Sequence, residues 1–353
     1  MTNFRISILC LAAALPLTVL TTGAQEATLQ PGKGVGFKSP DGNATLNIGG
    51  RVQIRHTYEE KSDSSTFSVP RLRLGFKGTL YQAWSFEVQT DLAKKEKATL
   101  KDGFVERTLG EHTRLRFGQF KTAFDRQQLE SSGRQTFVDR NIASDALGKA
   151  RDIGVQAHGK AMKGVVQYNA GLFNGAGEGN ASPNGGHMAV ARVSLNPLGD
   201  FGLSQGDVKP SASPRVFVDL AGYHAQDESG HSLDGTTGLA AGAGVKYAGL
   251  YATGEYFVKR AHAGADADGF YAQAGYMIAP EAFELAARYA QVDPDAAADD
   301  DTRTETTVAA NLFFEKAGHN LKLTADASLL TDATESGAAR DDYRTRVQFQ
   351  LVF

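Results

Sequence analysis

Basic side chains alternate with apolar side chains in several short segments of this chain. Arg71 and Arg73, for example, alternate with Leu72 and Leu74. The same alternation recurs around three other pairs of arginines, Arg51 and Arg55, Arg114 and Arg116, and Arg344 and Arg346. Because successive side chains of a β-strand point to opposite faces, each segment would have one basic face and one apolar face. Guanidinium groups bind phosphate and carboxylate bidentately, so the basic faces could bind anions.

A second group of basic residues lies in the longest stretch without a strand pattern, residues 122–150. Its basic residues and those at its two ends are Lys121, Arg126, Arg134, Arg140, Lys149 and Arg151. The stretch also contains Asp125, Glu130, Asp139 and Asp145, so its excess of positive charge is small. Two interpretations stay open: a segment that folds into a pore, narrows it and binds anions, or a solvated outer loop whose charges pair.

Other chemistries have weaker support in the sequence. The histidines form no His-Glu-x-x-His pair, and no Gly-x-Ser-x-Gly motif is present. The acidic stretch 293–301 lacks the spacing of a calcium-binding EF-hand loop, and Gly32–Gly36 lacks the spacing of a phosphate-binding loop. We therefore predict no enzyme, no catalytic or metal site and no cofactor, and nothing in the sequence indicates a nucleic-acid partner.

The strands that would position the arginines are clearest at the end of the chain. Tyr343, Val347, Phe349, Leu351 and the terminal Phe353 share one face, whereas arginines and glutamines occupy the other face until Val352. Such a strand separates two different environments. In a sandwich domain the apolar face would meet the core. In an outer-membrane barrel it would meet lipid, and the polar face would line a wet lumen.

Sixteen segments repeat this period-two pattern, which favours a barrel. They are 44–58, 69–80, 83–92, 99–107, 113–121, 151–159, 163–173, 187–196, 215–225, 237–248, 249–260, 268–279, 280–291, 303–316, 319–331 and 341–353. Most connections after even-numbered segments are short, and those after odd-numbered segments are longer and polar, beginning with 59–68. This rhythm is typical of barrels with short periplasmic turns and longer outer loops. The long connection 197–214 is an exception, because a short turn is expected there.

The N-terminal residues predict export. Residues 1–24 contain Arg5, an apolar run and small residues at Thr22 and Ala24, which is typical of a cleaved signal peptide. The single cysteine, Cys10, lies inside this leader. Residues 25–42 are predicted to be irregular, and residues 43–353 to form the barrel. Beyond the leader there is no apolar run of about 18 residues, so no membrane helix is predicted.

Several motifs resemble one known family, the phosphate-selective porins O and P. The resemblance rests on Leu115–Phe124, Leu129–Ser132, Phe137–Arg140, Arg151–Val155 and Asn196–Gly199. It implies a homotrimer of sixteen-stranded barrels that pass anions such as phosphate or polyphosphate. It also implies that Lys121, Arg126, Arg134 and Arg140 are binding candidates. The sequence departs from the family at Ala123, where proline is common, and in its basic-poor second half, where Lys322 and Arg288 are the main inward candidates.

We therefore predict an all-β, transmembrane, antiparallel barrel of about sixteen strands whose third outer loop folds inward. It would be a passive, anion-preferring channel in the bacterial outer membrane, with lipid around it, small anions inside it, and Phe353 resembling the signal that the barrel-assembly machinery reads. One alternative is a general porin whose wall charges are balanced by Glu87, Asp91 and Asp326. The others are a surface binding or adhesion barrel plugged by its own loops, and a soluble exported sandwich.

Overall fold

The structure is a computed structural model that describes residues 26–93, 97–180, 186–226, 235–262, 264–298, 301–332 and 340–353. The predicted signal peptide, residues 1–24, lies outside these residues. Among the described helices, none has the length and apolar character needed to cross a membrane.

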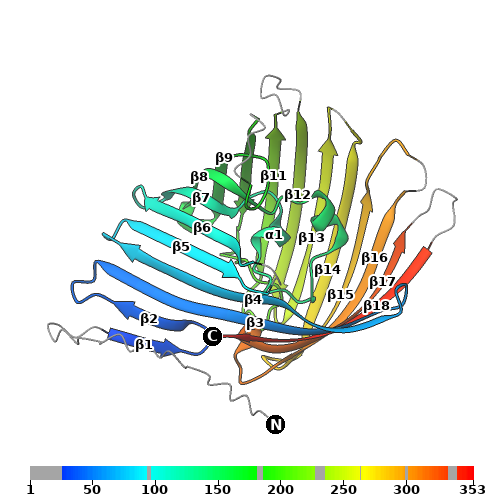
Figure 1. Cartoon of the computed structure of the whole chain (residues 1–353), viewed down its shortest axis with the longest axis horizontal. Coiled ribbons are helices and arrows are strands. Elements are labelled where there is room, and N and C mark those ends of the chain that lie inside the picture. Colours follow the sequence, from blue (N-terminus) through cyan, green and yellow to red (C-terminus); the bar gives the residue numbers. More distant parts are fainter. Residues whose placement is uncertain are drawn as a thin grey trace, which may run out of the picture.

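Sixteen antiparallel strands form a closed barrel, as the sequence predicts. The strands are β3 (Ala44–Glu59), β4 (Ser64–Leu80), β5 (Trp84–Asp91), β6 (Thr99–Thr108), β7 (Thr113–Lys121), β8 (Arg151–Ala161), β9 (Val166–Phe173), β10 (Met188–Leu195), β11 (Arg215–Ala225), β12 (Thr236–Tyr247), β13 (Leu250–Arg260), β14 (Ala267–Ala279), β15 (Phe283–Asp293), β16 (Arg303–Phe313), β17 (Leu321–Asp332) and β18 (Arg340–Val352). Each pairs with its neighbours in the chain, and β18 pairs with β3 to close the wall (Figure 1).

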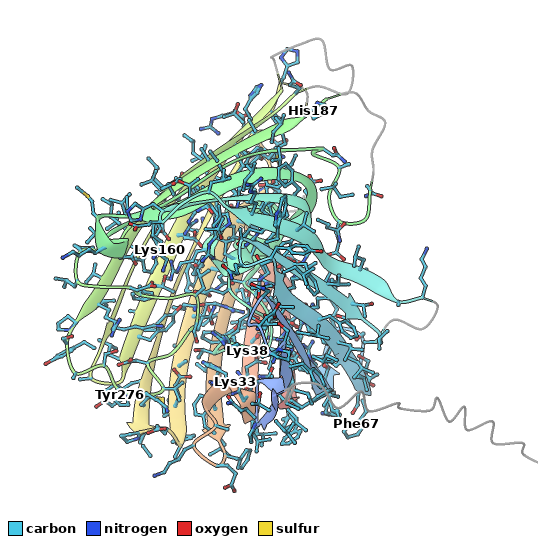
Figure 2. The ribbon with its side chains drawn as sticks, turned by 90° about the vertical axis from the view of Figure 1, so that its left-hand side faces the viewer. Lys33, Lys38, Phe67, Lys160, His187 and Tyr276 are labelled. Atoms are coloured by element: carbon cyan, nitrogen blue, oxygen red, sulfur yellow. The ribbon has the colours of Figure 1, made fainter. Side chains whose placement is uncertain are left out.

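The wall is apolar outside and polar inside. On β18, Val347, Phe349 and Leu351 are exposed on the outer face, whereas Arg346 and Gln350 are buried inside. Tyr276 of β14 likewise projects from the outer side of the strands (Figure 2). This is the reverse of a soluble sandwich, and it follows from the alternation in the sequence once the sheet closes around a polar interior.

The two ends of the barrel have different connections. We call the end with the connections 81–83, 109–112, 162–165, 196–214, 248–249, 280–282 and 314–320 the turn end, and the other the loop end. Most turn-end connections are short, as predicted. At the loop end, the prediction of a long loop at 59–68 is wrong, because β3 and β4 continue to a tight turn and Glu59 pairs with Ser64. The predicted outer loops after β9, β11, β15 and β17 lie partly outside the described residues.

The prediction that residues 25–42 are irregular is also wrong. Two short strands, β1 (Glu26–Gln30) and β2 (Gly34–Lys38), form a hairpin. β2 pairs with Thr45–Ile48 of β3, beyond the point where β18 stops (Figure 1). The hairpin therefore continues the hydrogen bonding of β3 past the end of the closed wall.

The barrel closes tightly at the last residue of the chain. The backbone of Phe353 both donates to and accepts from the backbone of Gly50 on β3, at N–O distances of 2.9 and 2.7 Å. A Cβ at Gly50 would lie 2.6 Å from Cζ of the Phe353 ring and 2.7 Å from the carbonyl oxygen of Arg73. Only a glycine leaves room for the terminal ring at this position.

The third connection at the loop end, residues 122–150, folds into the barrel as predicted. It contains two short helices, α1 (Arg126–Leu129) and α2 (Ile142–Leu147). Asp125 caps α1 by accepting a hydrogen bond from the Gln127 backbone N–H, and Asn141 caps α2 in the same way through Ser144. Figure 1 shows α1 between the two halves of the wall. We call residues 122–150 the inward loop.

Candidate functional site: the lumen and its inward loop

The inward loop packs against one side of the barrel. Its residues Phe124, Ala143 and Leu147 form a buried cluster with aromatic and aliphatic side chains of β11–β15, among them Tyr223 and Phe257. Large apolar side chains on the inner face of these strands are therefore covered by the loop rather than by water. This packing leaves the remaining open space on the side of β3–β9.

Acidic side chains of the same half of the wall hold the backbone of the loop. Glu255, Glu305 and Asp326 accept hydrogen bonds from the backbone N–H groups of Arg126, Ile142 and Val138, at 2.9, 3.0 and 3.0 Å. Carboxylates that accept backbone hydrogen bonds make strong, charge-assisted contacts. Many acids in the second half of the chain thus fix the loop and do not face open space.

The unexpectedly long turn-end connection, residues 196–214, also enters the lumen. Phe201 is buried against Phe217 and Tyr251 of the wall. Gln205 reaches the inward loop, where its backbone N–H donates to the Arg134 carbonyl at 2.9 Å. The predicted strand count is correct here. The connection is long because this turn is elaborated, not because a strand is missing from the count. The barrel is narrowed from both ends.

Two cavities lie between the inward loop and the wall of β3–β9. The first has a volume of about 570 Å³ and the second about 600 Å³. Arg73, Glu87, Gln89 and Ser131 line both. The first is lined by eight basic residues, Arg73, Arg114, Arg116, Lys121, Arg126, Arg151, Lys160 and Arg192, and by three acidic residues, Glu87, Asp102 and Glu111. The second is lined by five basic residues, Lys33, Arg51, Arg73, Lys77 and Arg134, and by one acidic residue, Glu87.

Arg134 and Arg51 face the second cavity with little neutralisation. Arg134 is exposed, and within the described residues it takes part in no ion pair. Arg51 is buried and donates to the hydroxyl groups of Ser131 and Ser132, at 3.2 and 2.9 Å. Hydroxyl partners position a guanidinium but leave its charge in place. Lys33, from the turn between β1 and β2, lines the same cavity, and it is labelled in the lower half of Figure 2.

Arg126 contributes to the lining of the first cavity, but it is almost fully buried. Its guanidinium pairs with Asp219 at 3.1 Å and donates to the Gly202 carbonyl at 2.5 Å. It also lies over the Phe217 ring, 3.7 Å from the ring centre. With 3 % of its surface exposed, this residue ties the inward loop to β11 and to the connection 196–214. Sequence spacing alone could not separate such an anchor from a pore-lining arginine.

Arg140 and Lys121 hold helix α1 by its carbonyl groups. Arg140 donates to the carbonyls of Gln127 and Glu130, at 2.9 and 3.2 Å, and Lys121 donates to those of Leu129 and Glu130, both at 2.9 Å. Neither has a carboxylate partner among the described residues. These contacts stabilise the loop, and neither side chain is neutralised by an ion pair within the described residues.

The alternation of inward and outward side chains in β7 shifts between Phe117 and Phe120, which suggests a β-bulge before Lys121. The described residues of β7 contain no such bulge. Both pairing registers of β7 are continuous through Gly118. Gly118 instead has φ of +124°, a conformation that favours glycine. A local backbone rotation, rather than an inserted residue, therefore changes the direction of the following side chains.

The four wall arginines of β4 and β7 point inward, and each has an acidic partner. Arg73 pairs with Asp91 at 3.0 Å, and Arg116 pairs with Glu106 at 2.7 Å. Arg114, whose side chain is more than half exposed, lies 3.7 Å from the same glutamate. Glu106 therefore serves two arginines, and it also meets His158 at 2.8 Å. Positive charge exceeds negative charge in this group.

The two inward candidates of the second half, Arg288 and Lys322, support the loop. Arg288 pairs with Glu305 at 2.5 Å and donates to the Asp139 carbonyl at 3.0 Å. Lys322 donates to the Gln135 carbonyl at 2.5 Å. Both side chains are buried against the loop, so they belong to its docking surface.

Arg55 and Arg71 converge on Asp139 of the inward loop, together with Arg346 of β18. Their shortest nitrogen–oxygen distances to the Asp139 carboxylate are 2.7, 3.0 and 3.2 Å. Burial alone would raise the pKa of Asp139, but these guanidinium groups outweigh it and hold the pKa well below its usual value. The sequence reveals Asp139 only as one acid of a mixed loop, because strands distant in the chain bring the three arginines together.

Sequence comparison places most of the chain in one family. Residues 43–353 match the family model described as phosphate-selective porin O and P. No curated protein sequence matches the chain.

Solved structures with the same fold include outer-membrane proteins, channels and porins of low sequence identity. OmpT of Vibrio cholerae superposes with a TM-score of 0.60 at 12% identity, covering 87% of this chain and 98% of that one. The anion-selective porin of Comamonas acidovorans gives 0.60 at 14% identity, with 88% and 100% covered. The outer-membrane channel DcaP of Acinetobacter baumannii gives 0.59 at 15% identity, with 90% and 99% covered. At these identities the likeness concerns the fold.

Proposed function

Because this chain belongs to the phosphate-selective porin O and P family, and its barrel is that of an outer-membrane porin, we propose that its channel prefers anions. Transport would be passive. Anions would cross because lumen arginines and lysines replace part of their hydration, weakly enough to let them leave.

The observation that carries this proposal is the charge of the second cavity. Five basic residues and one acidic residue surround about 600 Å³ of space between the inward loop and the wall. In a confined space with low-dielectric walls, such an excess creates a positive potential that concentrates anions and excludes cations. The acids that might have balanced it are used elsewhere, since Glu255, Glu305 and Asp326 hold the loop backbone.

We propose phosphate and short polyphosphates as the preferred solutes. Arg51, Arg73 and Arg134 line one cavity from three different segments, and guanidinium groups match the oxygens of phosphate. Addition of phosphate should reduce the chloride current of single channels in planar bilayers, and should do so more than an equal concentration of sulfate. Equal reduction by both anions would restrict the proposal to general anion preference.

A general, unselective porin is the second candidate. Two wall pairs favour it, Arg73 with Asp91 and Arg346 with Asp326, because paired charges contribute little to the field in the pore. In that case chloride and potassium would permeate equally. A channel that never opens in bilayers would instead support a binding barrel plugged by its loops.

We further propose that the barrel assembles as a homotrimer and that its last strand is read during insertion. The family resemblance supports the first proposal. The exposed Phe353, at the end of the apolar outer face of β18, supports the second. The mass of the detergent-solubilised protein by light scattering tests the trimer.

A further inference from the structure

The strongest feature outside the two cavities is the convergence of three wall arginines on one loop carboxylate. We call Arg55, Arg71 and Arg346 the arginine cage. Asp139 accepts four hydrogen bonds from the cage, two from Arg55 at 2.7 and 3.0 Å and one each from Arg71 and Arg346 at 3.0 and 3.2 Å. An ionised carboxylate has about four acceptor positions, so those of Asp139 are all used.

The arginine cage has more positive charge than the carboxylates around it can neutralise. Arg346 also makes a two-point contact with Asp326, with both distances at 2.8 Å, so three cations face two carboxylates. The Asp139 side chain is 27% exposed, whereas the three arginine side chains are between 3 and 17% exposed. Solvent therefore reaches the carboxylate, while its partners are shielded by the wall.

Wall residues fix the cage independently of Asp139. Arg55 donates to the side-chain oxygen of Gln348 at 2.9 and 3.1 Å, and Arg71 donates to that of Gln53 at 3.0 Å. The register of β3 with β4 also shifts between Gln53 and Arg55, where residues 69 and 70 lie opposite residue 54 alone. This bulge, which contains Pro70, places Arg55 and Arg71 at the same carboxylate. The cage would therefore keep its shape without its present occupant.

The occupant, in contrast, belongs to the inward loop. Asp139 lies between two loop positions that have their own contacts, Val138 N–H with Asp326 and the Arg140 guanidinium with α1. The loop thus has attachments on either side of Asp139. The Asp139 carboxylate resembles a small oxyanion. It occupies a preformed site and is covalently attached to the inward loop.

We propose that the arginine cage is a binding site for small carboxylates and other oxyanions, in which Asp139 is a tethered competing ligand. This inference rests on the proposed anion channel and adds a specific site to it. A tethered ligand competes at a high effective concentration, on the order of millimolar or more. The cage then binds a passing anion only briefly, so Asp139 keeps the site from trapping its solute.

Acetate provides the direct test, because it replaces the missing group of Asp139→Ala. In single channels that carry chloride, acetate should inhibit Asp139→Ala at a concentration at least about tenfold lower than the parent. The second substitution Arg346→Gln in Asp139→Ala should remove this sensitivity. Asp91→Ala is the matched control, since it removes a lumen carboxylate that pairs with a single arginine, Arg73, and should gain no such sensitivity.

Equal acetate inhibition of the parent and Asp139→Ala would overturn the inference. So would inhibition that persists after Arg346→Gln, because the bound anion would then lie elsewhere. Exclusion of neutral polymers of graded size shows whether Asp139→Ala widens the pore; a wider pore without acetate sensitivity means that Asp139 only anchors the loop. The proposed function fails separately, if the parent channel itself shows no anion preference.

Discussion

The Gln205 side chain donates a 2.7 Å hydrogen bond to the carboxylate of Glu130, although the two residues enter the barrel from opposite ends. Gln205 belongs to the turn-end connection 196–214, and Glu130 follows helix α1 of the inward loop. The same glutamine accepts the backbone N–H of Thr136 at 2.8 Å. The two segments therefore form one continuous obstruction on the side of β10–β17, and solutes are left with the side of β3–β9.

Gln205→Ala should loosen this obstruction. It leaves a buried carboxylate and a buried N–H without their partner, at a cost of about 1–3 kcal/mol for each group. Single-channel recordings should show a larger mean conductance and more noise than the parent. Lys209→Ala is the matched control, because this exposed residue of the same connection makes only a distant ion pair at 3.7 Å. Identical recordings for the two variants would show that the contact does not limit the pore.

Arg134→Gln and Arg126→Gln should differ in kind. Arg134 is exposed in the second cavity, so its neutralisation should lower the anion-to-cation permeability ratio about fivefold, for an interaction of about 1 kcal/mol. The change should shrink near 1 M salt, where screening acts over about 3 Å. Arg126→Gln should instead lower thermal stability, because it leaves Asp219 with one fewer cation. Equal selectivity in the parent and Arg134→Gln would place the constriction elsewhere.

Barrel closure should depend on the contact between Gly50 and Phe353. Gly50→Val would push a side chain into the terminal ring, and Phe353→Ser would remove the ring. Both should reduce the amount of heat-modifiable protein in the outer membrane. Gly110→Ala is a suitable control, since a Cβ there would meet nothing within 4 Å, although its φ of +90° adds local strain. Normal levels of Phe353→Ser would exclude a role of this residue in assembly while leaving the barrel intact.

The arginine cage should stay occupied as the pH falls. The three guanidinium groups hold the pKa of Asp139 below its usual value of about 3.9, despite the opposing effect of burial. A lowered pKa means that this contribution to stability is complete above the usual pKa and is lost only as the pH falls through the lowered one. Acetate sensitivity of the parent should therefore stay low at about pH 5. A parent channel that is as sensitive to acetate as Asp139→Ala at about pH 5 would contradict this direction.

The wall could be predicted from the sequence, whereas the contents of the lumen could not. Alternation at positions such as Phe349 and Gln350 is a local property that specifies which face meets lipid. The roles of Arg126 and Arg134 depend on whether Asp219, 93 residues away from Arg126 in the chain, lies within reach. The hairpin β1–β2 could not be predicted, because each of its strands has only five residues and β2 contains two glycines. The role of Asp139 could not be predicted either, because its three partners come from β3, β4 and β18.

The reversal potential of the parent channel in a potassium chloride gradient tests the central claim most directly. The measurement should be made near 0.1 M salt, where charges act over about 10 Å, with Arg134→Gln recorded beside the parent. The excess of basic residues around the second cavity predicts a reversal potential shifted toward the equilibrium potential of chloride. The shift should be smaller for Arg134→Gln. A potential near zero, or one of the sign set by potassium, would contradict the anion preference proposed here.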